Sequence, residues 1–128
     1  MVTLAEIDIV HDQFGKADTL DTYCRALDDL GVVSYDSYVV DGHTAFRTAA
    51  GDELATPAHH ELVEVAAEPD HAAVHATLAR AAAGEIGYVE MSTLLGAAGL
   101  DRWSVDTRRL VMTYTDVLGE TVLVEQLG

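Results

Sequence analysis

The stretch that decides the fold is VSYDSYVVDGHTAFRTA, which occupies residues 33–49. It contains two runs rich in β-branched and aromatic residues, 33–40 and 44–49, a composition typical of strands. The pair Asp41-Gly42 stands between them and favours the tight turn of a β-hairpin. The stretch therefore predicts two antiparallel strands that are neighbours in a sheet.

Four helices are predicted around this hairpin, because apolar residues recur there at helical spacing. Their expected bounds are 4–14, 19–30, 70–83 and 88–98; the second starts from an Asp18/Thr19 cap, and the third opens at Pro69-Asp70. Each ends at a glycine, the residue that most readily adopts the left-handed conformation after a helix. These are Gly15, Gly31, Gly84 and Gly99. Further strands are predicted over residues 53–56, 61–66, 101–106, 109–116 and 121–126, although residues 61–65 also fit a helical turn.

The chain superposes on itself without a gap at a shift of 68 residues. Tyr35 falls on Trp103 and Gly31 on Gly99, and the helix stripe and turn glycines recur in the same order. Each half alone exposes one apolar helix face and one half-covered sheet, and packing two halves together buries both. We therefore predict an α+β fold: a tandem duplication of a helix–helix–three-strand unit, with an antiparallel sheet packed against helices. One domain spans 1–128, with halves at about 1–67 and 68–128.

Acidic residues dominate the charge of this 128-residue chain. Asp and Glu number 22 against 7 Lys and Arg, which gives a formal net charge of −15. Such a chain repels phosphate backbones and anionic lipid surfaces, so neither nucleic acid nor a membrane is an expected partner. The single cysteine, Cys24, fits a reducing compartment, and no signal peptide or membrane-spanning stretch is visible. We expect a cytoplasmic protein that is a monomer or a homodimer.

Two histidine patterns suggest a catalytic or metal-binding hypothesis. His43 follows Asp41-Gly42 and precedes Thr44, so one loop presents an imidazole, a carboxylate and a hydroxyl for acid–base chemistry. The turn chemistry of Asp-Gly explains the same residues without a site. His71 and His75 lie four residues apart on a helix and can face one metal ion, although no third ligand is fixed. A solvated helix surface is the simpler explanation of that pair.

The remaining motifs give no catalytic residue and no cofactor. No nucleophile elbow surrounds any serine, and no glycine-rich phosphate loop is present. Cys24 lies inside a predicted helix, where a reduced and partly buried thiol is expected. His11 lies on an apolar helix stripe and is expected to be a hydrogen-bonded core histidine.

Aromatic residues on predicted strands suggest a ligand cleft. Tyr35 and Trp103 hold matching positions in the two halves, so a pseudo-twofold axis would set them on either side of the seam. Asp106 and Arg109 lie near Trp103 in the sequence and would supply polar groups. Large aromatic residues on strands also form ordinary cores, which is the alternative explanation.

Several segments together resemble a bacterial family of unknown function. They are YDSYVVDGHTAF (35–46), LATPA (54–58), GLDRWSVD (99–106), MTY (112–114) and LVEQ (123–126). Members are sometimes labelled phage-envelope-like, and the family is associated with the YdfO-like fold. The resemblance implies an α+β fold and no established activity. Members often carry cysteines in the fourth helix, where this chain has Met91, Ser92 and Leu95, so a thiol or metal role based on those cysteines does not carry over.

Two functions from different classes follow from these patterns. The favoured one is a non-enzymatic binding or interaction module for a small molecule or a protein. Its ligand groove is expected between the two halves, near Tyr35, Asp41, His43, Trp103 and Arg109. The alternative is a small hydrolase-like or metal-assisted enzyme that uses His43 with Asp41, or His71 with His75.

Overall fold

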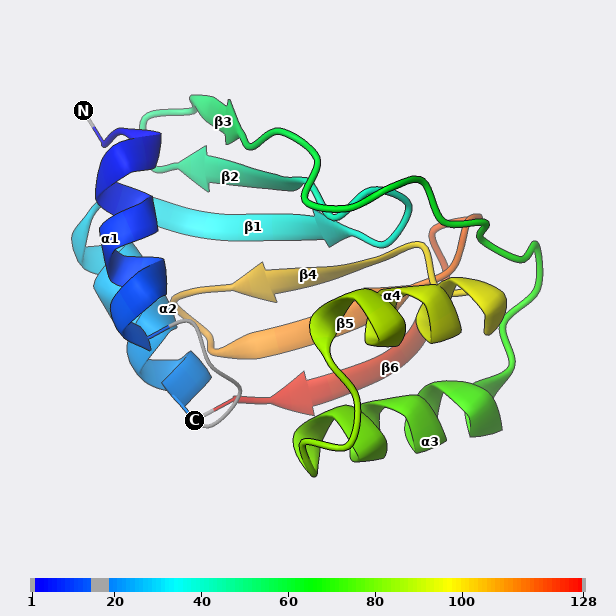
Figure 1. Ribbon diagram of the computed structural model, residues 1–128. Helices are drawn as coiled ribbons and strands as arrows, with labels where there is room; N and C mark the ends of the chain where they lie inside the picture. The colour runs from blue at the N-terminus through cyan, green and yellow to red at the C-terminus, as the bar shows by residue number, and fades with distance from the viewer. Residues whose placement is uncertain (1, 15–18, 128) are drawn as a thin grey trace.

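The computed structural model describes residues 2–14 and 19–127, and it contains four helices and six strands (Figure 1). The first helix pair is α1 (Leu4–Phe14) and α2 (Leu20–Asp29), and the second is α3 (His71–Ala82) and α4 (Tyr88–Ala97). The strands are β1 (Val32–Tyr38), β2 (Thr44–Thr48), β3 (Glu53–Ala55), β4 (Arg102–Asp106), β5 (Val111–Thr115) and β6 (Thr121–Gln126). The expected α+β class is confirmed. The residues of the expected stop and cap at Gly15 and Asp18 lie outside the described part.

One antiparallel sheet joins all six strands in the order β3-β2-β1-β4-β5-β6. Each half of the chain supplies three adjacent strands, and β1 and β4 pair at the centre. The shift of 68 residues carries the bounds of α2 onto those of α4. It also carries Asp36 onto Ser104, its cross-strand neighbour, so the pseudo-twofold axis passes between these two residues. The duplication itself stays a prediction, which this arrangement fits.

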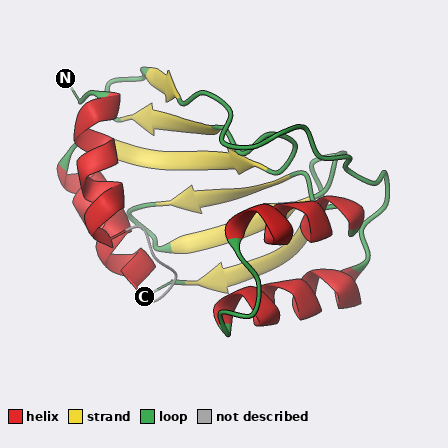
Figure 2. Ribbon diagram, in the orientation of Figure 1, coloured by secondary structure: helices red, strands yellow, loops and turns green. Residues whose placement is uncertain are grey.

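The two faces of the sheet differ in chemistry because successive side chains on a strand point to opposite sides. One face carries Tyr35, Phe46, Val105, Met112 and Tyr114, which belong to a single buried core with residues of all four helices. The ring of Tyr23 on α2 meets that of Tyr35 at 6.0 Å. Figure 2 shows one helix pair near each end of the strands. The opposite face carries Ser34, Asp36, Arg47, Ser104 and Thr113, and we call it the polar face.

Three local expectations were wrong. Residues 61–66 run extended but form no strand; Val63 N–H and Ala66 N–H donate to the carbonyls of Val40 and Gly96 instead. The hairpin turn is wider than Asp41-Gly42, because Tyr38 N–H donates to the His43 carbonyl and Gly42 N–H donates to the Tyr38 carbonyl. His11 is exposed rather than in the core, and its ring meets the edge of Tyr23 at 5.6 Å. No helix among the described residues has the length and apolar character needed to cross a membrane.

Cys24 is a free and fully buried thiol on α2. Burial raises the pKa of this thiol from 9.0 to about 11, and the Asp21 carboxylate nearby acts in the same direction. We therefore expect alkylation by iodoacetamide at pH 8 to be at least roughly a hundredfold slower in the folded chain than in the unfolded chain. Mass spectrometry with and without denaturant measures this ratio, and equal rates would contradict it. The folded state binds the thiol proton more tightly than the unfolded state does. The contribution of Cys24 to the free energy of unfolding therefore falls as pH rises from about 9 towards 11.

Candidate functional site

The aromatic pair expected to flank a cleft belongs to the core. Tyr35 is only 5% exposed, and the half-buried Trp103 packs against the same buried cluster. Both side chains are on the helix-covered face, because Tyr35 pairs with Val105, two residues from Trp103. Strands β1 and β4 pair along the seam between the halves. The seam is therefore a strand pair, and the side chains of Tyr35 and Trp103 beside it pack into the core.

Asp41 and His43 do come together, at the turn between β1 and β2. The His43 Nδ1 lies 2.5 Å from Asp41 Oδ1, and the backbone N–H of His43 donates to the same oxygen. Burial of Asp41 opposes ionisation, but the two hydrogen bonds from His43 outweigh it and place the pKa of Asp41 below its ordinary value. The imidazole also stacks on Tyr38, with ring centroids 4.4 Å apart and planes 8° from parallel. The ring of His43 is thus held in one orientation.

The turn around this pair is tied to the segment that follows β3. The backbone N–H groups of His59 and His60 both donate to the Asp41 carbonyl, and His59 Nδ1 lies 2.7 Å from the Gly42 carbonyl. An oriented imidazole suits general acid–base chemistry. The Thr44 hydroxyl, which the sequence places beside His43, forms its hydrogen bond with the Ser37 hydroxyl at 3.2 Å. The geometry therefore provides a base with its orienting carboxylate, and it equally explains both residues as turn structure.

The second histidine pair stands on an exposed surface. His71 and His75 both lie on the solvent side of α3. Within residues 2–14 and 19–127, no group of three or more His, Cys, Asp or Glu side chains is placed to hold a metal ion. The third ligand that a metal site at this pair requires is therefore not supplied by the described residues.

Arg109 lies at the opposite end of the sheet from Asp41 and His43. It sits in the turn between β4 and β5, beside the strand end where Ser34 pairs with Asp106. There it borders a hollow of about 350 Å³ on the polar face, which we call the polar hollow. Its lining comes entirely from β1, β4, β5 and the turn, namely Ser34, Asp36, Ser104, Val105, Asp106, Arg109, Val111 and Thr113. The five residues expected to share a groove thus fall into three separate places.

The polar hollow keeps unused hydrogen-bonding capacity. In the described part of the chain, the hydroxyls of Ser34, Ser104 and Thr113 form no side-chain hydrogen bond. They are therefore available to hydrogen-bond a ligand. One oxygen of Asp36 accepts from Arg47 at 2.6 Å, which leaves the other available. Asp106 Oδ1 accepts the two backbone N–H groups that begin the turn.

Arg109 is the cation that lines the polar hollow, and its guanidinium is only weakly paired. Its side chain is 84% exposed, and the carboxylate oxygen of Asp106 lies 4.0 Å from its Nε. An ion pair this long and exposed contributes little to stability. The guanidinium is therefore free to turn towards a ligand in the hollow. Its neighbour Arg108 differs, because its Nε donates to Asp28 on α2 at 2.9 Å.

The turn that carries Arg109 is held in a strained shape. Leu110 has φ of 57°, in the left-handed region that side chains other than glycine rarely adopt. The Gln126 side-chain amide donates to the carbonyls of Arg109 and Leu110, and Leu127 N–H donates to Leu110. Gly42, the match of Leu110 at the shift of 68, has a similar φ of 76° without side-chain strain. Strain that neighbouring groups hold in place is frequent at functional sites.

Sequence reasoning found Arg109 but missed most of this hollow. The hydroxyls of Ser34, Ser104 and Thr113 form no motif, because they come from three strands that are brought together only by the pairing of β1, β4 and β5. Alternating hydroxyl residues on a strand are the signal that indicates such a face. No sequence pattern indicates that Gln126 supports the turn.

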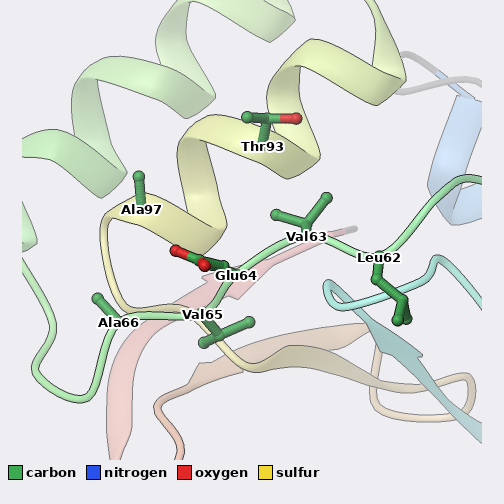
Figure 3. Close-up of a pocket in the computed structure, with 7 residues that line it drawn as sticks. All are labelled: Leu62, Val63, Glu64, Val65, Ala66, Thr93 and Ala97. Atoms are coloured by element: carbon green, nitrogen blue, oxygen red, sulfur yellow. The ribbon is translucent and has the colours of Figure 1, made fainter.

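A larger hollow of about 440 Å³ lies between α4 and the extended segment 62–66 (Figure 3). Figure 3 shows Thr93 and Ala97 on the helix and the side chains of 62–66 along the other wall. The lining is mostly aliphatic, and Glu64 is its single titratable residue. The hydroxyl of Thr93 donates a hydrogen bond to the Val89 carbonyl at 3.1 Å. This hollow offers little polar chemistry to select a ligand, so the polar hollow is the stronger candidate site.

Comparison with known proteins adds a family and no activity. None of the curated proteins matches this chain. A family model described as "Protein of unknown function (DUF1398)" matches residues 8–126, which include every strand and nearly all of the four helices. Because that match covers far more than half of the sequence, the chain belongs to the DUF1398 family of proteins of unknown function.

Proposed function

We propose that this chain is a non-enzymatic binding protein whose ligand occupies the polar hollow. The observation that carries the proposal is the set of groups with free bonding capacity around one concavity of about 350 Å³. Three hydroxyls, an unused Asp36 oxygen and the loosely held guanidinium of Arg109 converge there. Binding sites typically place a few convergent polar groups in a concave surface.

The proposed ligand is a small zwitterion, such as a free α-amino acid. The carboxylates of Asp36 and Asp106 suit an ammonium group, and the guanidinium of Arg109 suits a carboxylate at the other end. The hydroxyls of the strands can accept or donate hydrogen bonds along the remainder of the ligand.

Arginine substitutions in the turn test this proposal with a matched control. Arg109→Ala removes the cation that lines the hollow, and we expect it to weaken binding of a zwitterion about tenfold, or about 1.4 kcal/mol. Arg108→Ala makes the same chemical change one residue earlier, where the side chain points to Asp28, and should leave affinity unchanged. Calorimetric titration with a panel of amino acids, simple amines and polyols measures both. Absence of binding across the panel, or equal losses in both variants, would contradict the proposal.

An acid–base function at Asp41 and His43 stays a prediction, favoured by their 2.5 Å contact. Assay of the purified chain against ester and phosphoester substrates tests it, since a true base would give activity that His43→Gln abolishes.

Within the DUF1398 family, we propose that the chain is of the YdfO-like kind. We also propose that it acts in the cytoplasm, because its single cysteine, Cys24, is a free thiol, which suits a reducing compartment. A phage-envelope role receives no support from the polar hollow.

A further inference from the structure

The two edges of the sheet are unequal. The edge strand β3 ends after three residues, and Pro57, which has no backbone N–H, follows almost at once. The chain then turns towards the hairpin, where His59 and His60 donate to Asp41. A short strand followed by proline is a common protection against edge-to-edge association.

The other edge, β6, lacks this protection. It runs six residues, and the residue that matches Pro57 at the shift of 68 is Glu125. An irregularity near Val122 disturbs its start, but Leu123 to Gln126 pair regularly with β5. Figure 1 shows β6, in red, as the outermost strand. Strand pairing accounts for its β5 side only, so its outer backbone groups have no hydrogen-bond partner among residues 2–14 and 19–127.

The side chains of β6 suit a second copy of the same strand. Val124 is 55% exposed and lies on the polar face opposite Thr113. Glu125 is the one charged residue of β6 and lies near its end. When two such strands pair antiparallel about a twofold axis near residues 123–124, each Glu125 faces an uncharged residue of the other copy. A parallel arrangement would bring the two carboxylates together, which is unfavourable.

From these observations we infer that two copies of the chain join through β6, edge to edge, into one continuous antiparallel sheet. The contact is isologous, so it closes on itself as a twofold dimer and does not propagate. It places both polar faces on the same side of the joined sheet. The net charge of −15 on each copy opposes association, so the dimer strengthens as salt screens this repulsion. The inference is independent of the proposed ligand, since it rests on the sheet edges alone.

Sedimentation velocity measurements on matched valine variants test the dimer. At about 100 µM chain in molar salt, we expect a species of twice 13.7 kDa that dissociates on dilution. Val124→Glu adds a carboxylate beside the twofold axis, and we expect it to raise the dissociation constant at least tenfold. Val89→Glu is the control, because Val89 is 56% exposed on α4 and follows Tyr88, whose hydroxyl lies beside Gly42 in the turn between β1 and β2. It should leave the dimer intact, and the melting temperatures should show that both variants are folded.

Hydrogen exchange of the unmodified chain gives a second readout that needs no variant. Backbone amides of residues 123–126 should become more protected as concentration rises, while those of β3 should not change. A wild-type chain that stays monomeric under these conditions would overturn the inference, even if β6 accepts a peptide from another protein. So would a dimer that survives Val124→Glu, equal weakening by both variants, or protection that appears away from β6.

Discussion

Gly99→Ala is expected to be among the most destabilising single substitutions in this chain, with a loss of about 2–5 kcal/mol. Gly99 follows α4 with φ of 86°, a conformation in which any Cβ is strained. A Cβ at this position would also collide with the Glu68 carbonyl oxygen and lie 2.8 Å from Pro69 Cα. Both neighbours are backbone, so the segment leading into α3 must move to make room.

Gly31 provides the matched control, because it holds the same place after α2. Its φ is 95°, but a Cβ there has no heavy atom within 4 Å. Gly31→Ala should therefore cost only the conformational strain, about 1–2 kcal/mol. Urea unfolding of the two variants measures the difference, which isolates the close approach of residues 68–69 to the end of α4. Equal losses would show that this approach is not tightly packed.

Leu95→Ala should cost about 2–5 kcal/mol, because it empties a fully buried site. Leu95 lies on α4 in the core cluster, and Leu27 on α2 holds the matching place and is equally buried. We expect losses of similar size from Leu27→Ala and Leu95→Ala if the two helix pairs cover the sheet in equivalent ways. A loss from one variant alone would indicate that only one half carries the stability of the core.

An exposed leucine calibrates this experiment. Leu118 is 79% exposed in the turn before β6, so Leu118→Ala should change the free energy of unfolding by no more than about 0.5 kcal/mol. Chemical denaturation monitored by the fluorescence of Trp103 reports all three variants on one scale. A large loss of unfolding free energy in Leu118→Ala would mean that another surface covers Leu118 in solution. The proposed dimer through β6 does not require such a cover.

Much of the fold could be predicted because its signals are local. Helical spacing and terminal glycines give α4 to within one residue, and the turn at Leu118-Gly119 followed by the recurring strand pattern gives β6 at its observed bounds. Local pattern does not tell which face of a strand the helices cover, because that depends on pairing with distant strands. Tyr35 and Trp103 therefore suit a cleft or a core equally well in sequence, and the pairing of β1 with β4 decides for the core.

The candidate site divides in the same way. Asp41 and His43 are two residues apart, so their contact follows from the turn that the sequence already indicates. The polar hollow has no such local origin: Ser34 and Thr113 meet there through two successive strand pairings. The prediction that His11 lies in the core was wrong, because the apolar stripe of a short helix does not show how far the surface packed against it extends.

The central pairing of β1 with β4 has a consequence for the order of folding. Each outer hairpin joins residues close in the chain, so loop closure costs it little entropy. The central pair instead joins segments about 70 positions apart, a much larger loop. Each half can therefore assemble its hairpins and helices early, and the docking of one half on the other comes last. The residues around Asp36 and Ser104, and with them the polar hollow, are complete only when that final step has taken place.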